Sequence, residues 1–509
     1  MPITEYLFIN AQKYGEEEAI AYIAPNSKRY YLTWSEFNDC SNKIANMLIL
    51  KGIKQGDKIA ILMPNCLYWL PIYFGILKLG AVVVPLNYNN NVEDIFYCIK
   101  HSDCKGIFLS DNDKCYSALE KSASSNFLVF QVNDAEFGRE LSKYSACDIK
   151  ITLLDKDIAA VYFSSGTTGK SKAVLLSHGA LQAAAEIELA HHKQQHNDRF
   201  LCLTPLYHTG SKIHWFGSLI MGGALVIFTP TSPLRIIDMI EKEKISIVWL
   251  LVPQIQDVLD AIELGDVDIN NGVLSSLRLM HSGAQPIPAS LIWRWHNKFP
   301  HILYDTNYGL TESTGPGCIH LGVENIDKVG SIGKPDSHWL ADIVDENGNS
   351  LGKDIVGELI IKGPSVMLEY YKDSNSTNKT LKNGWLYTGD MAYIDEDDFI
   401  YLVDRKKDVI ISGGENIYPV QIENYLCSLE CIKDVAVIGL PNKRMGEIVA
   451  AIIEVKEGYS CTKKDINDYC EELPEYQRPL RIYFAKVIRN ATGKIDKKTM
   501  REKIVHTLI

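Results

Sequence analysis

The sequence predicts an α/β protein: a large N-terminal domain of doubly wound sheets with a small antiparallel β subdomain, followed by a small α+β C-terminal domain. Three patterns along the chain support this prediction. Short apolar runs of strand length alternate with helical patterns over roughly the first 400 residues, which is typical of parallel sheets covered by helices. From about residue 329 short strands with Gly and Asp turns follow, and after residue 408 a new αβ pattern begins.

Composition and charge restrict the class of protein. A chain of 509 residues has room for two or more domains of about 100 to 200 residues each. The 46% hydrophobic and 23% charged residues are typical of a globular protein, and the formal net charge of −11 argues against nucleic acid or an anionic membrane as a partner. The 12 cysteines include no CxxC pair, and the first residues lack the pattern of a secretory signal. Reduced thiols and a cytoplasmic location are therefore predicted.

Two segments in the first half of the chain combine an apolar helix with a buried strand. Residues 68–86 break at Gly80 and continue with the strand-like run AVVVPL. Residues 215–234 carry no charge over 20 positions, a length that could cross a membrane. However, Gly222 and the glycine after it interrupt this segment, and the β-branched run ALVIF follows at residues 224–228. We therefore expect a helix, a turn and a buried strand here, and no membrane span.

Further strands and turns complete the predicted elements. Buried strands are expected at residues 58–63, 106–109, 158–163 and 247–252. Turns rich in Gly, Asn and Asp are expected at residues 345–348, 383–384 and 395–398, around a strand at 357–363. The charged segment DRKKD at residues 404–408 separates this region from the last part of the chain, so we predict an N-terminal domain at 1–405 and a C-terminal domain at 406–509.

The clearest local motif is the segment YFSSGTTGKSK at residues 162–172. An apolar strand leads into glycines, small hydroxyl residues and lysines, which supply the backbone N–H groups, hydroxyl donors and positive charge that a polyphosphate requires. It is not a Walker A loop, because Ser164 stands where GxxxxGK[ST] requires Gly. An isolated loop of this kind is more often a solvated turn, but the flanking strand favours phosphate binding. The predicted phosphate-binding residues are Ser164, Ser165, Gly166, Thr167, Thr168, Gly169, Lys170 and Lys172.

Further motifs follow this loop in the order and spacing of a known superfamily. They are PLYHTG at residues 205–210, YGLTE at 308–312, YTGD at 387–390, DR at 404–405 with GGEN at 413–416, and NATGK at 490–494. With these motifs the chain resembles the adenylate-forming enzymes, which include acyl-CoA synthetases, peptide-synthetase adenylation domains and firefly luciferase. The resemblance covers almost the whole chain and is closest to the acyl-CoA ligases. It implies ATP, Mg²⁺ and coenzyme A as cofactors, and a mobile C-terminal domain.

The YGLTE motif implies how the nucleotide is held. By the resemblance, Tyr308 stacks on adenine beside Gly309, as an aromatic face can. Thr311 bonds phosphate, and Glu312 provides the hard oxygen ligand that Mg²⁺ prefers. Taken alone, Tyr308 would be interpreted as a core tyrosine. The resemblance assigns the ribose hydroxyls to Asp390 with Arg405, and the walls of the adenine and acyl pockets to the backbone of Ser282, Gly283 and Ala284.

Five further positions belong to the catalytic cycle that the resemblance implies. Lys494 bridges the attacking carboxylate and the α-phosphate, which stabilises the charge of the transition state. His208 shields the acyl site. Lys407 is the hinge between the two half-reactions, and its rotation brings the loop with Gly413 and Gly414 to the CoA tunnel. Without the resemblance, Lys494 would be interpreted as one more surface lysine in a basic tail.

The substrate is predicted to be a carboxylic acid without an α-ammonium group. Adenylation domains for α-amino acids place an Asp just after the position of His208, where this chain has Thr209. An ammonium group without a partner in a buried pocket would be strongly destabilising. His214 and His281 are expected near the acyl pocket, which favours a polar or aromatic acid over a long aliphatic one.

The predicted reaction has two steps. The acid and Mg-ATP give an acyl adenylate and pyrophosphate, and the thiol of CoA then gives acyl-CoA and AMP. An alternative enzyme would load the acid onto the phosphopantetheine of a carrier protein. A nucleotide-binding module without turnover and a luciferase-like monooxygenase are more distant alternatives, and the presence of both Lys494 and Glu312 argues against the module.

Overall fold

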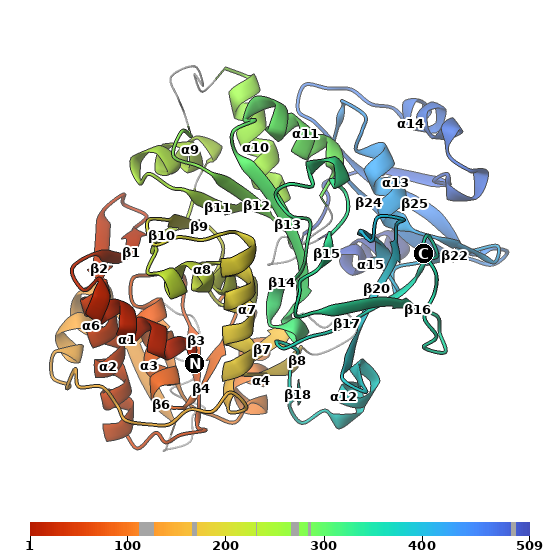
Figure 1. Ribbon diagram of the computed structural model, residues 1–509. Helices are drawn as coiled ribbons and strands as arrows, with labels where there is room; N and C mark the ends of the chain where they lie inside the picture. The colour runs from red at the N-terminus through yellow and green to blue at the C-terminus, as the bar shows by residue number, and fades with distance from the viewer. Residues whose placement is uncertain are drawn as a thin grey trace.

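The computed structural model describes residues 1–110, 127–164, 171–230, 232–265, 274–283, 287–489 and 495–508. Over these ranges the chain forms a nine-stranded sheet, a seven-stranded sheet and two five-stranded sheets (Figure 1). The predicted fold class is confirmed, because a large α/β region precedes a small antiparallel sheet and a small α+β unit at the C-terminal end.

The nine-stranded sheet has the order β15-β14-β13-β12-β11-β9-β10-β1-β2. Its central strands are parallel and its outer pairs are antiparallel. β10 coincides with the predicted ALVIF strand and is buried throughout. The strands are β1 (Glu18–Ile23), β2 (Arg29–Thr33), β9 (Arg199–Cys202), β10 (Ala224–Phe228), β11 (Ile247–Leu250), β12 (Leu279–Ser282), β13 (Leu303–Leu310), β14 (Gly315–His320) and β15 (Lys334–Pro335).

The seven-stranded sheet has the order β18-β8-β7-β4-β3-β5-β6. Five of its strands are parallel, and β8 and β18 add an antiparallel edge. The strands are β3 (Lys58–Leu62), β4 (Val82–Pro85), β5 (Cys104–Ser110), β6 (Leu128–Val132), β7 (Ile158–Ser164), β8 (Lys172–Ser177) and β18 (Glu369–Tyr370). β3, β5 and β7 confirm the predicted strands in this region.

Helices fill the space between the two large sheets and cover their outer faces. One hydrophobic core joins Ile59 of β3 to Leu225 of β10 through α3 and α8, whose Phe74 and Phe216 rings lie 5.6 Å apart. A second core packs α9, α10 and α11 on the other face of the nine-stranded sheet. The helices are α1 (Ile3–Lys13), α2 (Trp34–Leu50), α3 (Trp69–Lys78), α4 (Val92–His101), α6 (Asp134–Leu141), α7 (His178–His191), α8 (Thr209–Met221), α9 (Pro233–Lys242), α10 (Val252–Glu263) and α11 (Ala289–Lys298).

The two apolar segments discussed above have the expected structure. α3 and β4 lie within residues 68–86, and α8 and β10 follow one another with Gly222 between them. Gly222 has a left-handed φ of 77°, which ends α8 without the strain that a side chain would add. Among the residues that the structure describes, there is no helix with the length and apolar character that a membrane crossing needs.

The small antiparallel sheet has the order β16-β17-β20-β19, with β21 paired to β20. Asn383 and Gly384 form the predicted turn between β19 and β20, with φ values of 52° and 81°. The elements are β16 (Leu340–Val344), β17 (Gly357–Lys362), α12 (Ser374–Thr380), β19 (Leu381–Lys382), β20 (Trp385–Ile394) and β21 (Ile400–Arg405).

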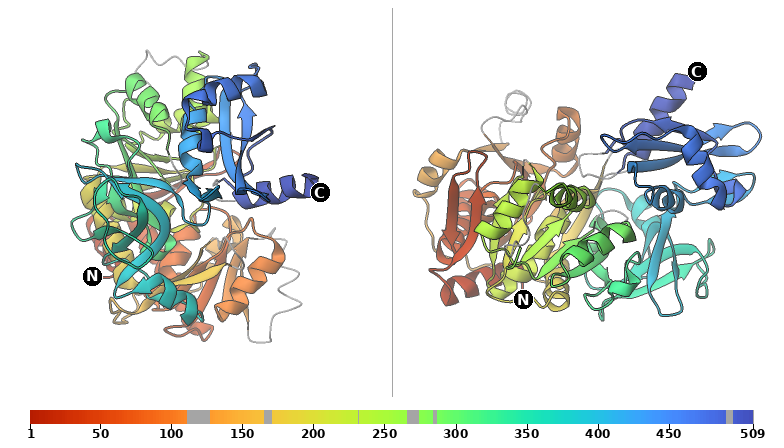
Figure 2. Two further views of the ribbon diagram at one scale, coloured as in Figure 1. Left: turned by 90° about the vertical axis from the view of Figure 1, so that its right-hand side faces the viewer. Right: turned by 90° about the horizontal axis from the view of Figure 1, so that it is seen from above.

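The C-terminal unit has its own sheet and core and projects from the rest of the molecule (Figure 2). β21 ends at Arg405, and the next strand, β22, belongs to this separate sheet. The predicted division into residues 1–405 and 406–509 is compatible with this change of sheet and stays a prediction. The elements are β22 (Ile410–Ser412), β23 (Glu415–Ile417), α13 (Pro419–Leu426), β24 (Ile432–Asn442), β25 (Gly446–Val455), α14 (Lys463–Tyr469), β26 (Arg481–Phe484) and α15 (Lys497–Leu508).

Candidate active site

A cleft of about 2890 Å³ lies where the two large sheets, the antiparallel sheet and the C-terminal unit meet. It collects predicted site residues that are far apart in the sequence. The predicted residues that line it are Ser164, Lys172, His208, Tyr308, Gly309, Thr311, Glu312, Asp390, Arg405 and Lys407. Other predicted residues lie outside the described part of the chain, namely Ser165, Gly166, Thr167, Thr168, Gly169, Lys170, Ala284 and Lys494.

Tyr308, Asp390 and Arg405 form one hydrogen-bonded group. β20 and β21 pair Asp390 directly with Arg405, and the two carboxylate oxygens of Asp390 lie 2.5 Å from Arg405 Nε and 2.5 Å from the Tyr308 hydroxyl, which donates. Burial raises the pKa of Tyr308 well above its ordinary value, and the neighbouring carboxylate raises it further. Tyr308 therefore stays a neutral hydrogen-bond donor, and the group presents an aromatic ring, an anion and a cation side by side.

A second group gathers around Tyr370, which the sequence analysis did not identify. Ser164 and Lys172 face each other at the open end of the β7–β8 pair. The Lys172 ammonium lies 4.6 Å from the centre of the Tyr370 ring, and the Tyr370 hydroxyl donates to Glu312 Oε1 over 2.8 Å. A hydroxyl, an ammonium group and a carboxylate thus lie at one end of the cleft, next to Thr311, which begins the short 3₁₀ helix η2 (Thr311–Ser313). This donor set fits a polyphosphate with a hard cation such as Mg²⁺.

Gly309 has a steric reason to be glycine. A Cβ at this position would lie 2.1 Å from the carbonyl oxygen of Gly315 on β14. Such a contact cannot form without moving the backbone, so glycine allows β13 and β14 to approach closely where the cleft begins.

Ser282 and Gly283 lie at the end of β12, one layer behind the residues that line the cleft. The Ser282 hydroxyl donates to the Leu250 carbonyl over 2.9 Å, so it links β12 to the neighbouring strand β11. A Cβ on Gly283 would lie 3.3 Å from Asn307 Oδ1 and 3.8 Å from Trp249 Nε1. Because Trp249 and Asn307 both line the cleft, the backbone of Gly283 supports the wall that they form.

His208 is presented to the cleft by the start of α8, where it is the N-cap residue. The loop before it is held by Lys212, which is fully buried and donates to the His208 carbonyl over 2.7 Å and to the Leu206 carbonyl. The Lys212 ammonium also faces the Tyr162 ring at 4.7 Å. The sequence analysis missed this positioning residue, although a single lysine in a helix with no other Lys, Arg, Asp or Glu is an unusual feature.

The C-terminal unit contributes to the cleft through one face. Lys407 lines the cleft with an exposed side chain, and partial desolvation lowers its pKa. Residues 495–498, directly after Lys494, also line the cleft. Gly413 and Gly414 instead form the exposed turn between β22 and β23, with φ values of 61° and 91°, and are not among the residues that line the cleft.

Comparison with protein-family models identifies the family. The model of the AMP-binding enzymes matches residues 7–371, and the model of the AMP-binding enzyme C-terminal domain matches residues 421–494. The chain therefore belongs to the AMP-binding enzyme family, and the predicted superfamily is confirmed.

Relatives and solved structures resemble the chain over nearly its whole length. Long-chain-fatty-acid–CoA ligase FadD13 of Mycobacterium tuberculosis is 30% identical over 494 residues, which cover 96% of each chain. 2-Succinylbenzoate–CoA ligase of Oceanobacillus iheyensis is 31% identical over 466 residues, which cover 91% of this chain and 92% of the relative. The solved structure of o-succinylbenzoate CoA synthetase (MenE) from Bacillus subtilis with the acyl-adenylate OSB-AMP has a TM-score of 0.85 at 26% identity and covers 98% of both chains. The same enzyme has been solved with ATP and magnesium ion.

Proposed function

We propose that this protein is an ATP-dependent acid–thiol ligase that joins a carboxylic acid to coenzyme A and releases AMP and pyrophosphate. The main support is the gathering of two groups on one cleft: the Tyr308, Asp390 and Arg405 group, and the Lys172, Glu312 and Tyr370 group. The named CoA ligases that resemble the chain over 91% of its length or more agree with this reaction.

The two groups suit the two ends of a nucleoside triphosphate. A carboxylate can accept about four hydrogen bonds. Asp390 can therefore accept bonds from ribose hydroxyls while it keeps its hydrogen bond from Tyr308 and its ion pair with Arg405. Lys172, Thr311 and Ser164 would bind phosphate oxygens. Glu312 would hold Mg²⁺, which neutralises phosphate charge when bound. The nucleotide would then lie along the cleft with its phosphates toward Tyr370.

The acyl side and the thiol side complete the proposal. His208, Thr209 and Trp249 line the cleft, and none of them is an acid that would pair with an α-ammonium group. Lys494 is proposed to neutralise charge where the carboxylate attacks the α-phosphate. For the second step we propose a turn of the C-terminal unit about Lys407 that brings Gly413 and Gly414 to the thiol, since these residues lie away from the cleft here.

A screen of both half-reactions tests the function. The purified protein is incubated with Mg-ATP and a panel of straight-chain, succinylated aromatic and hydroxycinnamic acids, and pyrophosphate, AMP and thioester are measured with and without CoA. We expect acid-dependent pyrophosphate release and CoA-dependent thioester. A folded protein that binds ATP but releases no pyrophosphate with any acid would refute the proposal. Faster loading of a phosphopantetheinylated carrier protein than of CoA would favour the alternative acceptor.

A cytoplasmic location is part of the proposal. It is supported by the 12 cysteines without a CxxC pair and by free thiols at the described positions. Fractionation of cells that express the full chain tests it.

A further inference from the structure

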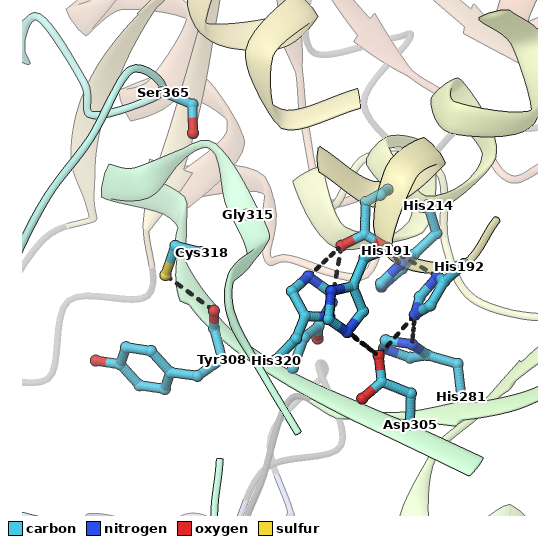
Figure 3. Close-up of polar contacts among 12 residues, drawn as sticks. His191, His192, His214, His281, Asp305, Tyr308, Gly315, Cys318, His320 and Ser365 are labelled. Carbon is cyan, nitrogen blue, oxygen red and sulfur yellow. Dashed lines mark hydrogen bonds and ion pairs between the residues drawn. The ribbon is translucent and has the colours of Figure 1, made fainter. Parts of the chain in front are cut away.

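A buried cluster of histidines and acids lies behind the wall of the cleft. It contains Glu188, His191, His192, His214, His281, Asp305 and His320, and we call it the histidine cluster. Figure 3 shows the five rings and Asp305 turned toward one another. Five of the 13 histidines of the chain come together here from α7 and its end, α8, β12 and β14. The proposed ligase reaction uses none of these side chains.

Glu188 is at the centre of the cluster and is completely buried. Its Oε2 lies 2.7 Å from His214 Nδ1 and 3.3 Å from His192 Nδ1. Its Oε1 accepts a hydrogen bond of 2.9 Å from the Asn307 side chain. The side chains of His192 and His214 are only 1% exposed. The carboxylate is thus oriented by an amide on one oxygen and by two imidazoles on the other.

Asp305 provides a second buried carboxylate, directly behind His192. His192 Nε2 lies 2.9 Å from Asp305 Oδ2, and His320 Nδ1 lies 3.0 Å from the same oxygen. The other oxygen, Oδ1, accepts the backbone N–H of Gly322 over 2.9 Å. A histidine that binds a metal through one nitrogen usually donates its other N–H to a carboxylate. His192, with Glu188 on one side and Asp305 on the other, has this arrangement.

The cluster holds two negative charges that need compensation and two nitrogens that lack hydrogen-bond partners among the described residues. Two buried carboxylates need compensation, and the ion-pair partners of Glu188 and Asp305 in the described part of the chain are all histidines. The Nε2 atoms of His214 and His281 are buried and have no hydrogen-bond partner among the described residues. A divalent cation would balance the two carboxylates and give such nitrogens a ligand.

We propose that the histidine cluster binds one divalent transition-metal ion of the zinc type, through Glu188, His192, His214 and His281. One ligand atom from each of these residues lies within 4.8 Å of all the others. Four ligands arranged as a tetrahedron at about 2.1 Å from zinc are about 3.4 Å apart. Ligand atoms as far as 4.8 Å apart must therefore close by about 1.4 Å, and a pair as near as Glu188 Oε2 and His214 Nδ1, at 2.7 Å, must open around the ion. Three imidazoles and one carboxylate suit zinc and its neighbours better than Mg²⁺ or Ca²⁺.

The site would be structural, because four protein ligands leave no open position for a substrate. It would join α7, α8 and β12. The His214 ring lies 4.8 Å from the Trp249 ring, which lines the cleft, so the ion would fix the cleft wall from behind. A surface hollow lined by His191 and Glu324 lies beside the cluster, since the His191 ring stacks on His320 at 3.7 Å.

The competing arrangement contains no metal. In that case His192 and His320 would both be protonated, and each would bridge Glu188 and Asp305 across distances of 2.9 to 3.5 Å. This arrangement balances the charge but leaves Nε2 of His214 and of His281 without a partner. The two arrangements differ in metal content, which can be measured directly.

The test uses the full-length protein, purified without a histidine tag and free of nucleotide. Metal content is measured by mass spectrometry, and Co²⁺ is added to the chelator-treated protein as a spectroscopic probe. We expect one equivalent of zinc per chain, the strong visible absorption of four-coordinate Co²⁺, and a higher melting temperature with Zn²⁺. A protein without zinc after growth in zinc-supplemented medium, without Co²⁺ bands and without a thermal shift overturns the proposal.

Two variants distinguish this site from adventitious binding. His281→Gln removes a ligand, and we expect at least tenfold weaker Zn²⁺ binding and loss of the Co²⁺ bands. His338→Gln is the matched control, since the His338 side chain is 72% exposed and its polar contacts within the described residues are with the nearby Ser337 and Asp336. It should leave one tightly bound equivalent. Equal zinc content and equal Co²⁺ spectra in both variants would refute the site. If His281→Gln does not fold, the Co²⁺ spectrum and stoichiometry of the wild type still decide the question.

Discussion

Replacing Asp390 by alanine tests the proposed nucleotide site most directly. The Asp390 side chain is 5% exposed, and its carboxylate lies 2.5 Å from both the Tyr308 hydroxyl and Arg405 Nε. Hydrogen bonds between ribose hydroxyls and this charged acceptor should contribute about 1.5 to 3 kcal/mol. Asp390→Ala should therefore raise the Kd for Mg-ATP by about 10- to 150-fold, at about 1.4 kcal/mol for each factor of ten.

The same change also affects stability, so both quantities must be measured. Without the carboxylate the buried Tyr308 hydroxyl loses its acceptor, which costs about 1 to 3 kcal/mol of unfolding free energy. Calorimetric titration with Mg-ATP gives the affinity, and thermal unfolding shows whether the variant is folded. Tyr308→Phe is the matched control, because it removes the same hydrogen bond but keeps the ring and the carboxylate. Unchanged ATP affinity in a folded Asp390→Ala protein would remove Asp390 from the site.

Three further changes test separate parts of the molecule. Lys494→Ala should abolish pyrophosphate release but retain thioester formation from supplied acyl adenylate, and equal loss of both in single-turnover assays would indicate a general structural role. Lys407→Pro fixes φ at about −65° and should leave adenylation near wild type while thioester formation falls steeply; wild-type conversion of preformed adenylate would contradict the hinge. Burial lowers the pKa of Lys78 although Asp148 lies 3.1 Å away. Below the pKa of about 10.4 that Lys78 has in the unfolded chain, the unfolded chain therefore binds more protons than the folded chain. The free energy of unfolding of the wild type then rises with pH, by at most about 1.4 kcal/mol per pH unit. Lys78→Met lacks this contribution, so its stability deficit in urea unfolding should widen from about pH 8 to about pH 10; a constant deficit would contradict the linkage.

The sequence predicts strands well where burial on both faces restricts composition. β10 coincides with the ALVIF run because every one of its residues is buried. The strand expected at 247–252 ends earlier, at Leu250, because α10 begins at Val252 with a proline in its first turn. An apolar run alone does not show where a strand gives way to the first residues of a buried helix.

Contacts between distant segments could not be predicted in the same way. Tyr370 carries no motif of its own and reaches Glu312 because β18 pairs with β8 and the Met367 backbone N–H donates to the Glu312 carbonyl over 2.8 Å. The histidine cluster has no spacing signature, because its members come from segments between Glu188 and His320. His214 and His281 were expected near the acyl pocket; the structure places them behind Trp249, and they are not among the residues that line the cleft.

The contacts around Arg405 give a physical reason to place the proposed hinge at Lys407. Arg405 is held by Asp390, and the Lys406 backbone N–H donates to the Gly389 carbonyl over 2.9 Å, so both residues are tied to β20. Within the described part of the chain, Lys407 has no hydrogen bond to the antiparallel sheet. The chain then turns, since the Asp408 N–H donates to the Arg405 carbonyl over 2.8 Å. A rotation at Lys407 would therefore leave the Asp390 and Arg405 group intact, so the ribose could stay bound while the C-terminal unit changes the face that it presents to the acyl group.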